Sequence, residues 1–144
     1  MLDGPLPDPL GALIIEVRSS PGVAALVTDR VRGLRPAPGD ARPKGAYRAF
    51  VVLSVLDAPP DPRLPMARAV YGASCYGATG QQAMALWGAV AAAVHRAGVR
   101  RKASGLAIWD SFASGGSEDE DPDTQQPVVR GTLEVLYATR LLAP

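Results

Sequence analysis

Three aspartates at alternate positions, Asp119, Asp121 and Asp123, come nearest in this chain to a site for a metal ion. Alternate carboxylates supply the first three ligands of a helix–loop–helix calcium loop, which continues with a glycine and ends on a bidentate glutamate at its twelfth position. Thr124 and Arg130 occupy those two positions here. We therefore expect no metal site of this kind and interpret the stretch as a solvated acidic loop, with a weak calcium site of another geometry as the alternative.

The residues that could serve as nucleophile or base lack partners in the sequence. His95 is the single histidine and has no Cys, Asp or Glu one helical turn away, so a zinc site is not expected. The segment 72–77 contains Ser and Cys75, but its glycines are one residue too far apart for a nucleophile elbow. Cys75 is better explained as a small buried residue of a strand. We predict a protein that is not an enzyme, with no catalytic residue, no cofactor and no metal.

Composition limits the remaining classes of protein. The 144 residues suffice for a single domain, 1–144, and 47% of them are apolar, as in globular chains. A net charge of +1 argues against nonspecific nucleic-acid binding, which needs a surplus of Lys and Arg. The longest apolar run, Ala89 to Val94, is too short for a membrane span, and the start of the chain does not resemble a secretion signal. One cysteine fits a reducing, intracellular setting.

The first half of the chain predicts a helix followed by a hairpin. Asp8 and Pro9 have the residue types of a helix start, and apolar residues at helical spacing follow as far as Ser19. Prolines and glycines predict a flexible loop at 35–45. The other segments expected here are a further apolar turn at Val23–Val27, a short extended piece at Arg30–Arg32, and two paired strands at Tyr47–Asp57 and Ala67–Tyr76.

The second half predicts one long helix and two more strands. Thr79 and Gln82 have the spacing of a capping box, and an apolar stripe leads from there to a stop at Gly98. Strands are expected at Gly105–Ser111 and Val128–Arg140, with a flexible loop at 114–126 between them. The whole pattern predicts an α+β fold, a mainly antiparallel sheet of about four strands with two helices packed on one face.

Charged residues are separated along the chain. Opposite patches on one chain can pair head to tail between copies, so we predict that these residues form an interface, with independent solvated loops as the alternative. The candidate interface residues are basic at Arg30, Arg32, Arg35, Arg42, Lys44 and Arg48, and acidic at Glu118, Asp119, Glu120, Asp121 and Asp123.

Taken in order, these segments resemble the tail terminator, or tail completion, proteins of long-tailed bacteriophages. The resemblance covers nearly the whole chain but consists of element order and short segments. Those segments are the opening helix 8–19, Thr28 to Val31, the proline-rich loop before the strand at 49–56, Val70 to Gly77 running into the helix at Thr79, Asp121 to Thr124, Pro127 to Val129, and Leu133 to Tyr137.

This resemblance implies a structural virion protein. It would form a hexameric ring that caps the tail tube, ends tube polymerisation and joins the tail to the neck. Its partners would be other copies, the tail tube protein, a neck or head-closure protein, and DNA passing through the channel without sequence-specific binding. It would be made in the host cytoplasm and reside at the tail–neck junction, away from any membrane. The alternatives are a head-closure or connector protein of the neck, and a small ligand-binding α+β domain that would use Arg68, Ser74 and Tyr76.

Overall fold

The computed structural model describes residues 8–33, 47–57 and 66–138, and these form three helices and a six-stranded sheet. The expected loop at 35–45 lies outside the described residues. In chain order the elements are α1 (Pro9–Ser19), α2 (Pro21–Val27), β1 (Val31–Gly33), β2 (Phe50–Asp57), β3 (Met66–Tyr76), α3 (Gly80–Arg100), β4 (Lys102–Ala103), β5 (Leu106–Glu120) and β6 (Pro127–Ala138).

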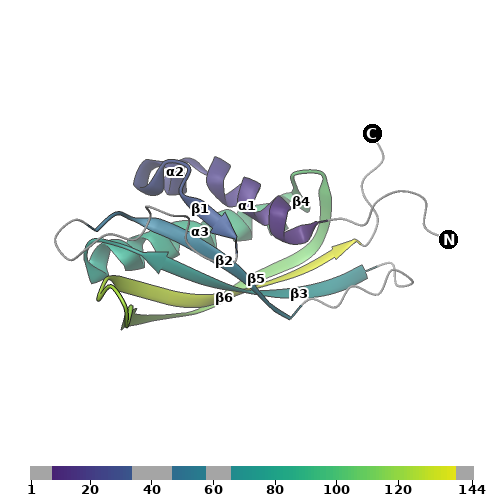
Figure 1. The fold of residues 1–144 in the computed structure, drawn as a ribbon. Helices are drawn as coiled ribbons and strands as arrows, with labels where there is room; N and C mark the ends of the chain where they lie inside the picture. The colour runs from purple at the N-terminus through teal and green to yellow at the C-terminus, as the bar shows by residue number, and fades with distance from the viewer. Residues whose placement is uncertain (1–7, 34–46, 58–65, 139–144) are drawn as a thin grey trace.

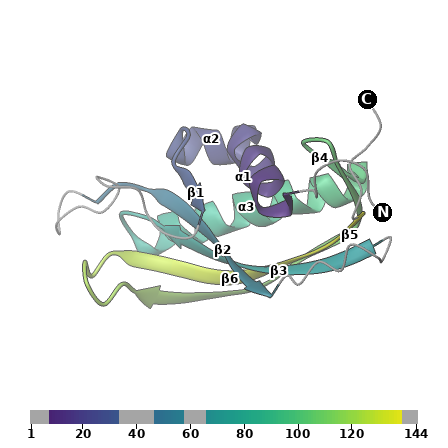
Figure 2. The same cartoon turned by 45° about the vertical axis from the view of Figure 1, so that its right-hand side comes forward.

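The sheet has the strand order β1-β2-β3-β6-β5-β4 and curves into a half-barrel. Only β1 and β2 pair in parallel, and all the other neighbouring strands are antiparallel. The three helices lie on one face of the curved sheet, with α3 next to the strands and α1 and α2 beyond it toward β1 (Figures 1 and 2). The opposite face carries no helix in the described part of the chain.

Both predicted helix starts are confirmed. The Asp8 carboxylate accepts a hydrogen bond from the N–H of Gly11 at 3.0 Å, and Pro9 occupies the first helical position. At α3 the Thr79 hydroxyl accepts from the N–H of Gln82 at 3.1 Å, while the Gln82 side chain accepts from the N–H of Ala78. These contacts satisfy N–H groups that have no partner inside the helix, which fixes where each helix begins.

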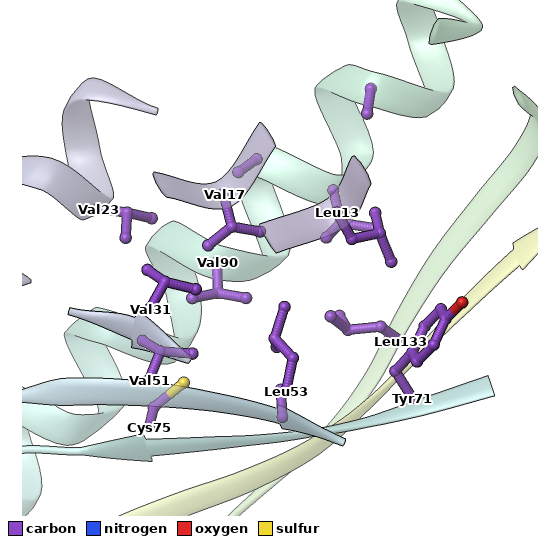
Figure 3. Packing of buried hydrophobic residues seen from close by; sticks show 14 of the residues in the cluster. Leu13, Val17, Val23, Val31, Val51, Leu53, Tyr71, Cys75, Val90 and Leu133 are labelled. Carbon is purple, nitrogen blue, oxygen red and sulfur yellow. The ribbon is translucent and has the colours of Figure 1, made fainter. Parts of the chain in front are cut away.

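The core lies between the helices and the sheet. Alternate residues of β3 and β6, including Tyr71, Cys75 and Leu133, point toward α3 and are completely buried, whereas the residues between them point to the other face. Leu13 of α1 and Val90 of α3 meet them from the helix side (Figure 3). Burying these side chains supplies the main favourable term for folding, roughly 1.5–3 kcal/mol for each large apolar side chain.

The indole of Trp87 on α3 packs into a slot where the sheet has no side chains. A Cβ on Gly131 of β6 would lie against the outer carbons of the indole ring, and a Cβ on Gly116 of β5 would lie 2.6 Å from its Nε1. Gly116 also has φ of +100°, which favours glycine. Two glycines on paired strands therefore allow α3 to approach the sheet closely at this point.

The predicted, mainly antiparallel sheet of about four strands with two helices is wrong. The described residues form a mixed sheet of six strands, in which β1 and β2 are a parallel pair, and three helices. The extra strands are three and two residues long, too short to show any alternation of apolar and polar residues. The extended piece at 30–32 was expected, but its direction depends on how the chain returns to β2, which local sequence does not determine.

The acidic segment also differs from the expected loop. β5 continues through Ser114 and Glu118 to Glu120, so only residues 121–126 turn. Pairing with β6, in which Asp119 lies opposite Val128, holds this half of β5 extended. Most of its side chains are exposed on both faces, so the strand carries no apolar pattern and has the composition of a loop.

Among the residues that the structure describes, no single helix combines the length and apolarity needed to cross a membrane; only α1 and α2 counted together, across an 80° bend, meet that measure.

Candidate interaction surfaces

The acidic turn, residues 118–126, is held by a network of hydrogen bonds. One carboxylate oxygen of Asp121 accepts from the backbone N–H of Asp123 at 2.9 Å and of Thr124 at 3.0 Å, and the Asp121 N–H donates to the carbonyl of Gln126 at 2.9 Å. Burial acts to raise the pKa of the Asp121 carboxyl, but hydrogen bonds from Thr124, Asp123 and Tyr76 outweigh it and lower that pKa. The turn is thus built around an ionised aspartate.

Gln126 anchors the acidic turn to the rest of the sheet. Its side chain is 1% exposed, and its amide nitrogen donates to the carbonyl of Arg48 at 2.9 Å and to that of Gly77 at 3.3 Å. One side chain therefore joins the β5–β6 turn to the residues before β2 and after β3. Gln126 could not be identified from the sequence, because its burial and its carbonyl partners depend on segments far away in the chain.

Two tyrosines contact the acidic turn at the same end of the sheet. The Tyr47 hydroxyl donates to the carbonyl of Thr124 at 2.6 Å, and the Tyr76 hydroxyl lies 3.4 Å from the second carboxylate oxygen of Asp121. The ring of Tyr76 stacks on Phe50 with the centroids 4.3 Å apart. Burial raises the pKa of both hydroxyls, and the negative charges of Glu120 and Asp121 at Tyr47 and of Asp121 at Tyr76 raise it further, so both are protonated donors at neutral pH.

Of the predicted basic interface residues, those that the structure describes lie at this same end, on the opposite edge of the sheet. Arg30 precedes β1 and donates from Nε to the carbonyl of Ala49 at 2.8 Å, Arg32 lies within β1, and Arg48 lies just before β2. Arg35, Arg42 and Lys44 lie outside the described residues. On the acidic side, Arg130 pairs with Asp119 at 2.7 Å, an exposed ion pair that contributes little to stability.

Strand register shows how the two charged groups are related. One row of paired residues runs across the sheet from Val31 of β1 through Val51, Cys75 and Val129 to Glu118 of β5. Basic residues thus flank one end of this row and acidic residues the other. The geometry leaves the predicted head-to-tail interface open as a hypothesis, and it shows that the two patches occupy opposite edges at the same height.

The candidate nucleophile and base do not meet in the structure. Cys75 is completely buried in β3 and faces the core, and burial raises the pKa of its thiol to about 12, so it remains an unreactive thiol. His95 is exposed on α3. Across the described ranges there is no group of three His, Cys, Asp or Glu side chains that could hold a metal ion.

The sheet-face residues of the ligand-binding alternative do not converge. Arg68, Ser74 and Tyr76 share the outer face of β3, but Arg68 and Ser74 are six residues apart, which is about 20 Å along a strand. Arg68 forms an ion pair with Glu134 at 2.5 Å across to β6, and this hydrogen bond lowers the pKa of the Glu134 carboxyl. These residues are the outer face of the strand pair and do not surround a common ligand.

Large apolar side chains are exposed on the two lateral edges of the sheet, a feature that was not predicted from the sequence. Val55 and Leu56 of β2 are 44% and 60% exposed, and Trp109 and Phe112 of β5 are 57% and 50% exposed. Both strands have a register shift close to these residues, after Val55 and after Ile108. A bulge changes which face the next side chain points to, so alternation in the sequence could not show their exposure.

Comparison with known proteins supports this fold and gives no family. The sequence matches no protein family and no curated protein. Among solved structures, the chain is similar to one described as "Virion of native gene transfer agent (GTA) particle", with a TM-score of 0.64 and 17% identity over 89% of this chain and 92% of that one. At this identity the likeness shows a shared fold.

Proposed function

We propose that this protein is a structural subunit of a phage-like virion. The observation that carries the proposal is the fold shared with a chain of the gene transfer agent particle, over nearly the full length of both chains. The arrangement of polar residues supports it, because Asp121 and Tyr47 form hydrogen bonds that hold the acidic turn in place. A subunit of this kind acts through its surfaces.

Within the virion, we propose the role of tail terminator. Copies would form a ring on the end of the tail tube, stop its polymerisation and offer a second surface to the neck. The acidic turn and the basic residues near β1 lie at the same end of the sheet. That end would face the tail tube or the neck, while the lateral edges of the sheet contact other copies. Opposite charges at one end favour a protein partner with a mixed charge pattern over a nucleic acid.

The test is to delete the gene in a cell that produces the particles and to image what assembles. Loss of a terminator leaves tube growth unchecked, so we expect tails of variable, excessive length that are not joined to heads. Tails of normal length that lack heads would instead indicate a head-closure or connector protein. Intact, infectious or DNA-transferring particles that lack the protein by mass spectrometry would overturn the virion role itself.

A further inference from the structure

Both lateral edges of the sheet carry strand segments without a partner in the described part of the chain. β4 covers β5 only at Leu106 and Ala107, and β1 covers β2 only at Val51 to Leu53. The edge of β5 beyond Ile108 and that of β2 from Ser54 to Asp57 therefore pair with no strand among these residues. An unpaired strand edge presents N–H and C=O groups that a second chain can bind.

On the β2 side the open segment follows the part that β1 covers. Val51 donates its N–H across to the carbonyl of Arg30, and alternate residues of a strand direct these groups to the same side, so Val55 directs its own outward. β1 is less available as an edge, because the carbonyl of Val31 already accepts from Arg18 at 3.1 Å and its N–H donates to Asp29 at 2.8 Å. The free segment on this side is therefore 54–57.

The exposed apolar residues lie on these same two segments. Val55 and Leu56 lie on the open part of β2, and Trp109 and Phe112 lie on the open part of β5. Side chains of this size on an unpaired edge favour contact with another protein surface over exposure to water. Because the segments lie on opposite edges of one sheet, a copy cannot bring its own two segments together.

The register places the two open segments at the same height. One row of paired residues runs from Val55 through Tyr71 and Leu133 to Ala113. β2, β3, β6 and β5 alternate in direction, so β2 and β5 are antiparallel. When residues 110–114 of β5 in one copy lie beside residues 54–57 of β2 in the next, the two strands are therefore antiparallel without a shift along them. From Gly115 onward β5 has to pass outside β1, which covers β2 at Val51 to Leu53.

We propose that copies of this chain join edge to edge, with β5 residues 110–114 of one copy pairing with β2 residues 54–57 of the next. At the joint Phe112 lies beside Leu56 on the outer face of the sheet, while Val55 and Ala113 lie side by side on the core face. Charge favours the same alignment, because the acidic end of β5 then lies at the height of Arg32 and Arg48. The contact joins two different surfaces of the chain. When successive copies are related by a rotation without a shift along its axis, such contacts close into a ring. This proposal rests on the proposed function only in requiring that copies assemble.

The test is disulfide trapping in a Cys75→Ala background, which removes the single natural thiol. Val55→Cys and Ala113→Cys lie in one row, so in the joint their Cα atoms would be about 5.5 Å apart, within the range of a disulfide. Under mild oxidation the double variant should give a ladder of covalent oligomers ending at the ring size. Each single variant should give no cross-link, and an equal mixture of the two should give only dimers.

The matched control is the pair Val55→Cys with Ser114→Cys, whose side chains point to opposite faces of the sheet and should not cross-link. Dimers from a single variant would show a symmetric contact and overturn the proposal, as would a double variant that stays monomeric both in free solution and in purified particles. A ladder in a chain that is absent from particles would support the edge joint while the virion role fails. If the chain is present in particles but gives no ladder, the virion role stands and the edge joint fails.

Discussion

The hydroxyl of Tyr71 is the one fully buried side-chain polar atom without a hydrogen-bond partner among the described residues. Its ring fills the core beside Leu133, while the hydroxyl loses its hydration with no compensating bond. We predict that Tyr71→Phe leaves the free energy of unfolding unchanged or raises it by about 1 kcal/mol, measured by urea denaturation. Tyr71→Ala is the control for the ring and should cost roughly 3–5 kcal/mol. A loss above about 1 kcal/mol in Tyr71→Phe would show that the hydroxyl has a partner.

Gln126 represents the opposite case of a buried polar group with its partners in place. Gln126→Met keeps the size of the side chain but leaves the carbonyls of Arg48 and Gly77 without this donor. We predict a loss of about 1–3 kcal/mol in the free energy of unfolding, together with faster hydrogen exchange in the acidic turn. Gln81→Met, the same change at an exposed position of α3, should stay within about 0.5 kcal/mol. Equal effects at both positions would contradict the anchoring role.

At the scale of elements, the fit between α3 and the β5–β6 pair depends on Trp87 and the glycine beneath it. Gly131→Ala should destabilise the protein by about 1–3 kcal/mol, because the new methyl group would overlap the outer ring of the indole. Trp87→Phe removes those outer ring atoms, so the same change should cost less in that background. Gly88→Ala is the matched control. That helical glycine has open space around it, and alanine there should stabilise by up to about 1 kcal/mol.

The acidic turn should also respond to pH through Asp121. The pKa of this carboxyl is lowered in the folded protein, so its contribution to stability is present above the unfolded pKa, near 4, and is lost as pH falls through the folded value. We predict that Asp121→Asn lowers the free energy of unfolding at pH 7 and that this difference shrinks below about pH 4. Asp123→Asn, at an exposed position, should show a smaller effect. Parallel pH curves for the wild-type protein and Asp121→Asn would contradict the prediction.

The elements that could be predicted from sequence are those whose signals are local. The two helix starts depend on side chains within four residues of the helix, β2 and β3 are rich in β-branched and aromatic residues, and β6 alternates clearly. The structure of residues 114–120 and the length of α2 were harder to predict. The acidic half of β5 is extended because β6 pairs with it, which its composition does not show. The apolar turn expected at Val23–Val27 is the last part of α2, a helix of only seven residues that begins at Pro21.

At the scale of the whole molecule, sequence separated the charged residues but could not show their relation in space. The two groups are about 80 positions apart in the chain, and register alone places them at equal height on opposite edges of the sheet. The apolar edge segments were missed for a related reason, since a strand reveals its free edge only when its neighbours are known. An assembly surface made of strand edges therefore has to be inferred from topology.

Blocking the two edges separately tests whether the joint is heterologous. Val55→Pro removes an N–H that points away from β3, so β2 keeps its pairing with β3 while its open edge is blocked. Phe112→Lys places a charge on the open edge of β5. We predict by light scattering that each variant alone is a monomer and that their equal mixture forms dimers and nothing larger, because one intact β2 edge and one intact β5 edge remain between them. Assemblies of wild-type size in either variant, or no association in the mixture when the wild type assembles, would contradict edge-to-edge pairing.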